Sequence, residues 1–167
     1  ALAQGQALWK GRDLLALTED QYRTIRGREI AMIFQDPMSS LNPSFTVGFQ
    51  IDEVLKIKMG IRDAAERRAR GLSLLKEVGI PAPEERWNSY PHQMSGGMSQ
   101  RVSIAMALAS EPELLIADEP TTALDVTVQA QILELLRRLI HERHMSMIFV
   151  THDLAVAAKV CDEIAVF

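Results

Sequence analysis

The sequence of 167 residues has little of several features that would indicate particular classes of protein. Its single cysteine, Cys161, cannot form an internal disulfide and fits a reducing compartment. The net charge of −4 leaves no basic excess, so a nucleic-acid backbone is not expected as the main partner. No apolar run approaches the roughly 18 to 20 residues that span a bilayer, and residues 1–13 lack the pattern of a secretory leader. We therefore expect a cytoplasmic location, with any membrane crossed by other chains.

Predicted strands and helices alternate in the first and last parts of the chain. Short apolar segments predict strands at 7–9, 30–34, 114–117, 147–150 and 164–167. Capping residues and helical periodicity predict helices at 18–26, 99–110 and 127–143, and a short helix from residue 153. Strands that alternate with helices favour an α/β fold with a parallel sheet covered by helices on both faces.

The middle of the chain, residues 35–94, has a different character. Proline and glycine separate its helices, which are expected at 46–58 and 63–78, and no strand signal of comparable strength occurs there. We expect a helical insertion at one end of the sheet. The chain then divides into residues 1–35 and 99–167, which form the α/β core, and residues 36–98, which form the helical subdomain.

Two adjacent carboxylates, Asp118 and Glu119, follow the strand expected at 114–117. In open α/β sheets, ligands bind at the carboxyl ends of the strands. Adjacent side chains on an extended chain point in opposite directions, so one carboxylate can face a metal ion while the other faces a water. This division suits nucleotide hydrolysis. An acidic cluster that caps the following turn is the alternative interpretation.

Two further polar residues follow predicted strands. Gln35 carries an uncharged amide that can bind a water or coordinate a hard cation, and it also begins the helical insertion. It is therefore placed to report the state of a nucleotide to that insertion. His152 is expected at the same sheet edge as the two carboxylates, which favours a role in the site. A helix cap or a solvated side chain remains the alternative for this histidine.

The run Ser95-Gly96-Gly97 directly precedes the helix expected at 99–110. Two glycines allow backbone N–H groups to approach an anion closely, and a helix N-terminus adds partial positive charge. The pattern indicates a phosphate-binding turn, with a flexible turn before a helix as the alternative.

Taken together, these residues resemble the ATP-binding cassette (ABC) ATPase family over nearly the whole chain and in the family's motif order. The resemblance implies a P-loop NTPase-like fold with ATP and Mg²⁺ as ligands. It makes Glu119 the general base and Asp118 the residue that holds Mg²⁺, mainly through water. It also makes Gln35 the Q-loop residue, with catalytic and metal-binding roles, and His152 the switch histidine that contacts the γ-phosphate.

The same resemblance implies a dimer of cassettes that close head to tail. Ser95, Gly96 and Gly97 match the signature motif, which binds the ATP held by the partner subunit, and Asp125 matches the D-loop. The residues on either side, Met94 and Met98, depart from the family's usual Leu and Gln, but the serine and both glycines are retained.

A second departure concerns the phosphate-cradling loop, G-x-x-x-x-G-K-[ST], which does not occur in the sequence. This loop normally holds the β- and γ-phosphates and supplies a hydroxyl to Mg²⁺. We therefore expect an N-terminally truncated, internal fragment of a larger ATPase subunit, with little activity on its own.

The run ADEPTTALDVTVQAQIL is most similar to the oligopeptide, dipeptide and nickel importer branch of the family. The expected function is that of an importer's ATPase subunit for peptides or similar small solutes, on the cytoplasmic face of the inner membrane. Its expected partners are a second ATPase subunit, permease subunits and, indirectly, a solute-binding protein, with no nucleic acid. Two alternatives stay open: a soluble ABC ATPase of DNA repair or translation, and a non-catalytic interaction module.

Overall fold

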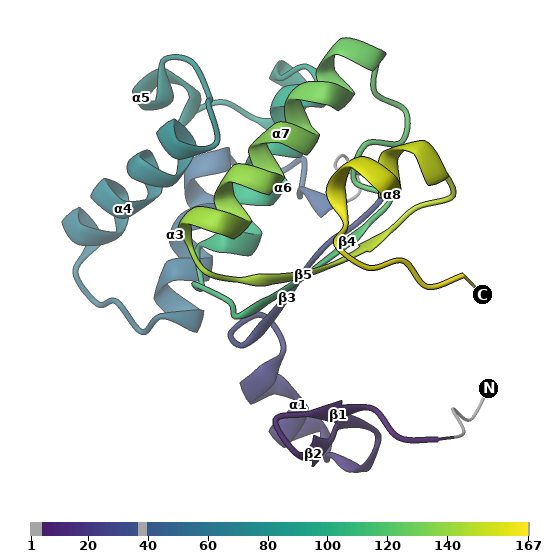
Figure 1. Ribbon diagram of the computed structural model, residues 1–167. Coiled ribbons are helices and arrows are strands. Elements are labelled where there is room, and N and C mark those ends of the chain that lie inside the picture. Colours follow the sequence, from purple (N-terminus) through teal and green to yellow (C-terminus); the bar gives the residue numbers. More distant parts are fainter. Residues whose placement is uncertain (1–4, 37–39, 167) are drawn as a thin grey trace.

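The computed structural model describes residues 5–36 and 40–166 (Figure 1). Residues 1–4 and 37–39, and Phe167 of the last expected strand, lie outside the described residues. The elements in chain order are β1 (Leu8–Trp9), β2 (Arg12–Asp13), η1 (Leu14–Ala16), α1 (Glu19–Ile25), β3 (Ile30–Ile33), α3 (Val47–Lys58), α4 (Ala64–Glu77), α5 (Pro83–Arg86), η2 (Pro91–Gln93), α6 (Gly96–Leu108), β4 (Leu114–Asp118), α7 (Val126–Glu142), β5 (Ser146–Val150) and α8 (Leu154–Val160). None of the described helices is both long and apolar enough to cross a bilayer.

The central sheet is parallel, and its strand order is β3-β4-β5. Successive side chains on a strand point to opposite faces, so the register separates two sets of residues. The buried or half-buried set consists of Ala31, Ile33, Leu115, Ala117, Met147 and Phe149. The opposite face, which we call the open face, carries Met32, Ile116, Ile148 and Val150.

The expectation that helices cover both faces of the sheet is wrong for the described residues. Helices α6 and α7 lie on the same side of the sheet, where they pack against its buried set (Figure 1). On the open face, Met32, Ile148 and Val150 remain 39%, 51% and 44% exposed. The alternation of strands and helices indicated a parallel sheet correctly, but it did not determine which face each helix covers.

Most helices begin where their capping residues predict. Thr18, Thr46 and Asp63 each accept a hydrogen bond from a backbone N–H in the first turn of α1, α3 and α4 respectively. Asp153 does the same for α8. These side chains satisfy amide groups that a helix N-terminus leaves unpaired.

Helix α6 begins three residues earlier than expected. Ser95 is its N-cap and accepts a hydrogen bond from the N–H of Met98, so Gly96 and Gly97 lie inside the first turn and not before it. A Cβ atom at Gly97 would lie 2.6 Å from Cγ1 of Val128, which shows that glycine lets α6 approach α7 closely. The expected subdomain boundary between residues 98 and 99 therefore falls within a continuous helix.

The two terminal strands also differ from expectation. The first, β1, pairs only with β2 in an antiparallel hairpin and does not join the parallel sheet among the described residues. The last, expected at 164–167, is absent from residues 164–166, where Ile164 and Val166 are 51% and 81% exposed. Apolar residues form a strand only where a neighbouring strand supplies hydrogen-bond partners, which is a tertiary property that a local pattern does not specify.

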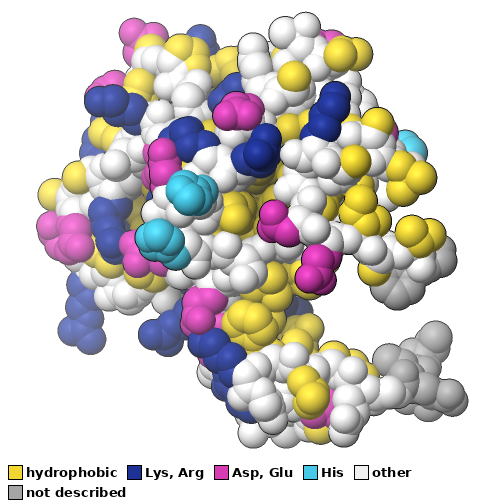
Figure 2. Space-filling view, viewed as in Figure 1, with side chains coloured by type: hydrophobic (Ala, Val, Ile, Leu, Met, Phe, Trp, Pro, Cys, Tyr) yellow, Lys and Arg dark blue, Asp and Glu magenta, His cyan; other side chains and the backbone are white. Residues whose placement is uncertain are grey.

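Residues 5–26 form an N-terminal lobe that projects below the rest of the molecule in Figures 1 and 2. Glu29, just before β3, attaches this lobe by accepting hydrogen bonds from Trp9 Nε1 and Arg12 Nη2, both at 2.9 Å. The Trp9 bond, and secondarily Arg12, holds the pKa of Glu29 below its ordinary value.

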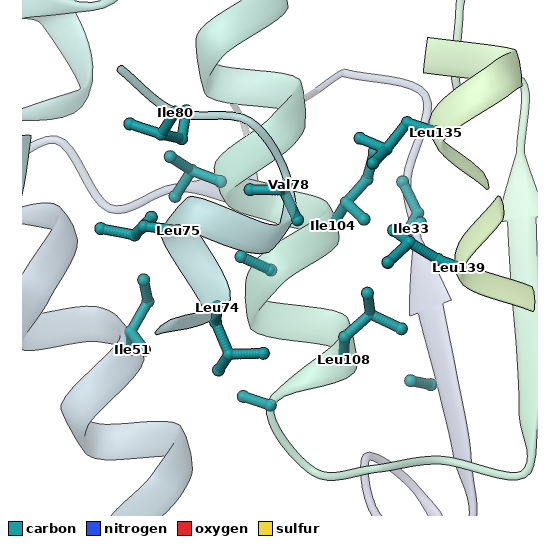
Figure 3. Packing of buried hydrophobic residues seen from close by; sticks show 14 of the residues in the cluster. Ile33, Ile51, Leu74, Leu75, Val78, Ile80, Ile104, Leu108, Leu135 and Leu139 are labelled. Carbon is teal, nitrogen blue, oxygen red and sulfur yellow. The ribbon is translucent and has the colours of Figure 1, made fainter. Parts of the chain in front are cut away.

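A continuous apolar core joins the sheet to the helical segment (Figure 3). Near the sheet, Ile33 lies close to the side chains of α6 and α7, and away from it Ile51 and Leu75 pack between α3 and α4. Helix α6 contacts both halves and therefore sets the position of the helical segment relative to the sheet.

Within the helical segment, the indole of Trp87 fits between two helix glycines. A Cβ atom at Gly48 of α3 or at Gly71 of α4 would clash with the Trp87 ring. The guanidinium of Arg68 stacks 5.5 Å from the ring centroid. We call Gly48, Gly71 and Trp87 the tryptophan slot, because only glycine leaves room there for the indole.

Candidate functional site

The carboxyl ends of the three parallel strands bring together three residues that the sequence singled out. Glu119 follows β4, and its Oε2 accepts a hydrogen bond from Gln35 Nε2, at 3.0 Å, just after β3. Its Oε1 lies 2.9 Å from Nδ1 of His152, just after β5. Parallel strands end at the same edge of a sheet, which explains how residues far apart in the sequence meet here.

The backbone at Glu119 is unusual, with a φ of 44°. This left-handed conformation costs a residue with a Cβ atom on the order of 1 to 3 kcal/mol. The Glu119 N–H donates to Val150 O of β5 at 2.9 Å, and Thr122 Oγ1 donates to Glu119 Oε2 at 2.8 Å. These bonds hold the carboxylate in place. We refer to Gln35, Glu119, Thr122 and His152 as the Glu119 cluster.

The electrostatics of the cluster follow from the contact between Glu119 and His152. The hydrogen bond from His152, and then that from Thr122, lowers the pKa of Glu119 below its ordinary 4.5. The same contact with Glu119 raises the pKa of His152 above its ordinary 6.5. The pair is accessible to water, since the His152 side chain is 77% exposed, so the solvent screens much of this attraction.

Asp118 occupies a different environment from Glu119. As the last residue of β4 it lies opposite Val150 in the register, on the face of the sheet that carries Ile116. The expected division between a metal and a water assumed an extended chain through both residues, but Glu119 lies beyond β4 and has a left-handed backbone, so strand alternation does not set the direction of its side chain. The roles of the two carboxylates remain predictions.

No group of three or more His, Cys, Asp or Glu that could hold a metal occurs in the part of the chain that the structure describes. Mg²⁺ commonly binds through one or two carboxylates together with waters and phosphate oxygens, so it does not require such a group. Asp118 and the amide of Gln35 offer such oxygen ligands.

The predicted nucleotide-binding residues of the signature lie elsewhere. Ser95 caps α6, and a Cβ atom at Gly96 would lie 3.6 Å from Leu124 Cδ2. Asp125 caps α7 by accepting a hydrogen bond from the N–H of Val128 at 3.0 Å. In the described residues, no hydrogen bond joins residues 95–97 to the Glu119 cluster. Ser95 and Asp125 are thus N-caps of helices, and the two glycines lie inside α6 and not in a flexible turn before it. The roles of these residues toward a nucleotide remain predictions.

Sequence reasoning missed two residues near the site. Thr122 lies three residues after Glu119, and the sequence pattern indicated no functional role for it, although its hydroxyl donates to Glu119. Gln100 is fully buried on α6, and its Nε2 donates to Pro120 O at 2.7 Å. A glutamine at a position that packs into the core was the available signal for Gln100.

The fold and this edge define an α/β protein whose sheet presents an acidic pair, an amide and an imidazole at the carboxyl ends of its strands. A family model described as "ABC transporter" matches residues 1–122. The chain therefore belongs to the ABC transporter family.

Comparison with individual relatives shows which branch of the family the chain is most similar to. The chain is 58% identical to the oligopeptide transport ATP-binding protein OppD of Bacillus subtilis (strain 168), over 98% of this chain and 45% of the relative. It is 56% identical to the dipeptide transport ATP-binding protein DppD of Escherichia coli (strain K12), over 95% of this chain and 48% of the relative. The chain thus spans about half the length of these relatives, and its similarity to the oligopeptide and dipeptide branch is confirmed.

Solved structures confirm the fold class. A dimeric ATP-binding cassette, MJ0796, in a post-hydrolysis state bound to ADP and Pi, matches with a TM-score of 0.77 and 36% identity, covering 89% of this chain and 63% of that one. The cassette cbiO1 from Clostridium perfringens matches with a TM-score of 0.77 and 28% identity, covering 93% and 59%. The expected P-loop NTPase-like fold of an ABC ATPase is correct.

Proposed function

We propose that this chain is part of the ATP-binding and ATP-hydrolysing subunit of an importer for peptides or similar small solutes. The observation that carries the proposal is the Glu119 cluster, which gathers a carboxylate, an amide and an imidazole at the ligand-binding edge of the sheet. The 58% identity to an oligopeptide transport ATP-binding protein supports the importer class.

In the proposed mechanism, Glu119 orients the attacking water and accepts its proton on a carboxylate oxygen. Asp118 and Gln35 hold Mg²⁺, which when bound stabilises negative charge on the transferred phosphoryl group. His152 contacts the γ-phosphate. While His152 remains bonded to Glu119, the lowered pKa makes this carboxylate a weak base. Loss of that contact would restore its basicity.

The remaining site residues act across a dimer in this proposal. Residues 95–97, with Asp125 nearby, face the nucleotide held by a second ATPase subunit, because free N–H groups at a helix N-terminus bind phosphate well. The helical subdomain, residues 36–98, meets permease subunits at the cytoplasmic face of the inner membrane, and a solute-binding protein delivers the cargo. Lysine and arginine are interspersed with acidic side chains on the face drawn in Figure 2, which gives no support to a nucleic-acid partner there.

We also propose that the 167-residue chain by itself hydrolyses little ATP. Its sequence contains no phosphate-cradling loop, so the Glu119 cluster lacks the groups that position the substrate. Turnover by the chain alone that Glu119→Gln abolishes would contradict this.

The test of the proposed function uses the full-length subunit that carries this chain, purified with its permease partners. Glu119→Gln should lower ATP turnover by about 10² to 10⁴-fold while nucleotide binding persists, because the substitution removes the base and leaves the shape of the side chain. Glu134→Gln, an exposed position in α7, is the matched control and should leave turnover unchanged. Unchanged turnover in Glu119→Gln would show that Glu119 is not the base. No turnover in the unaltered subunit would overturn the ATPase function.

A further inference from the structure

A buried glutamine connects the signature helix to the segment that carries Glu119. Gln100 lies on α6, in the turn that follows Gly96 and Gly97, and it is 0% exposed. Its Nε2 donates a 2.7 Å hydrogen bond to the carbonyl oxygen of Pro120. Pro120 is the residue directly after Glu119.

This bond restricts the backbone at Glu119 from its C-terminal side. The N–H of Glu119 is already held by Val150 O of β5 at 2.9 Å. The pyrrolidine ring fixes φ of Pro120 near −65°, and the Gln100 amide fixes the direction of the Pro120 carbonyl. The left-handed conformation of Glu119 is therefore set between β5 on one side and α6 on the other.

The same helix contacts the chain further along. Gly96 and Gly97, at the start of α6, pack closely against Leu124 and Val128 respectively. Helix α6 thus holds the segment that follows Glu119 at two points, one polar at Pro120 and one formed by close packing.

Stability alone does not account for glutamine at this position. Gln100 Oε1 is buried and has no hydrogen-bond partner among the described residues. An unpaired buried acceptor carries a desolvation cost, which offsets what the hydrogen bond to Pro120 O contributes to stability. An apolar side chain of the same length would remove that unpaired acceptor but leave Pro120 O without this donor, so the two costs are of the same kind. Of the two polar atoms of the amide, only Nε2 makes a contact, and this contact is with Pro120.

We propose that Gln100 is a positioning residue that couples the phosphate-binding turn, residues 95–97, to the orientation of Glu119 in the same subunit. The inference rests on the proposed ATPase function. Gln100 touches no reacting atom in this scheme. It fixes where the carboxylate stands when the turn engages a nucleotide across the dimer.

The test compares Gln100→Met with the unaltered full-length subunit. Methionine keeps the length of the side chain but removes both the donor and the unpaired acceptor. We expect kcat for ATP to fall about tenfold or more, because a small misplacement of a catalytic group is costly, while KM stays within about twofold. The thermal unfolding midpoint should stay close to that of the unaltered subunit.

Ser103→Ala is the matched control. Ser103 lies on α6 close to one turn after Gln100, is 8% exposed, and has a buried hydroxyl without a partner among the described residues. Its substitution should change neither kcat nor KM, which separates the Pro120 contact from general effects of altering α6.

The possible failures are distinguishable. If the unaltered subunit hydrolyses ATP and loses this activity in Glu119→Gln, but Gln100→Met keeps its kcat, only the role of Gln100 is overturned. A loss of kcat that merely tracks a lowered unfolding midpoint also overturns it. Should Gln100→Met fail to fold, Gln100→Leu replaces it, and failure of both would show a structural role instead. No hydrolysis by the unaltered subunit would overturn the proposed function itself.

Discussion

The tryptophan slot and the Glu119 cluster are held in place in opposite ways. Trp87 is 8% exposed and fills a space that two glycines leave open, so its position depends on close packing. Glu119 is held by hydrogen bonds, one of them to a histidine side chain that is 77% exposed. A packed contact has few alternative arrangements, whereas a hydrogen bond to an exposed group can break and reform with water as a substitute partner.

A second contrast is between the cationic side chains at the C-terminal end of α4, in the helical segment, and the histidine of the Glu119 cluster. Arg101 donates to Val78 O at 2.7 Å and Arg138 donates to Glu77 O at 2.8 Å, which fixes the C-terminal end of α4. Arg143 forms a two-bonded ion pair with the Glu77 carboxylate, at 2.8 and 2.6 Å. Among the described residues, His152 contacts one carboxylate, that of Glu119, and its charge depends on pH. The C-terminal end of α4 is therefore held by several bonds from permanently charged side chains, whereas the contact at the sheet edge depends on the protonation of one exposed histidine.

The largest effect that tests this contrast is expected at the slot. Gly71→Ala would force a methyl group into the Trp87 ring and should lower the free energy of unfolding by about 1 to 3 kcal/mol. This figure is the net loss, because it already allows for the gain of about 1 kcal/mol in helix propensity that alanine brings. Urea denaturation measures the net effect. In combination with Trp87→Phe, the cost of Gly71→Ala should shrink, and strictly additive effects would contradict the clash.

A smaller effect is expected within the Glu119 cluster. Thr122→Val keeps the shape of the side chain and removes the 2.8 Å bond to Glu119 Oε2, which still accepts from Gln35. The free energy of unfolding should fall by about 0.5 to 1.5 kcal/mol, as for a typical single hydrogen bond. A loss as large as that of Gly71→Ala, measured in the same denaturation experiment, would remove the distinction between the two regions.

The smallest effect on stability concerns the pair of Glu119 and His152, and it depends on pH. Because the pKa of His152 is raised in the folded chain, its contribution is complete below the ordinary value of 6.5 and is lost as the pH rises through the raised value. Because the pKa of Glu119 is lowered, its contribution is complete above 4.5 and is lost as the pH falls through the lowered value. The pair therefore stabilises most between pH 4.5 and 6.5.

NMR titration of the histidine rings measures this pair directly. Glu119→Gln should lower the titration midpoint of His152, because the substitution removes the carboxylate that raises its pKa. If the titration midpoint of His152 is the same in both proteins, the contact with Glu119 does not persist in solution.

Much of the fold could be predicted because its signals are local. The caps at Thr18, Thr46 and Asp63 act on the first turn of their own helices, and the gathering of Gln35, Glu119 and His152 follows from the shared edge of parallel strands. The early start of α6, the uncovered sheet face and the missing strand at 164–166 depend on contacts between distant segments, which a local pattern does not contain.

The two missed residues near the site have the same explanation. Thr122 reaches the carboxylate because the chain turns sharply after Glu119, and Gln100 contacts Pro120 because α6 packs against the segment that follows this turn. Neither contact can be inferred from spacing, since each depends on a backbone conformation that most residues avoid.

That conformation places two demands on a single position. Glycine would relax the left-handed backbone at residue 119, and asparagine would tolerate it better than most residues, yet neither supplies a carboxylate. Chemical function and conformational ease thus select different amino acids here. A glutamate at this turn therefore supplies the carboxylate at the cost of a strained backbone.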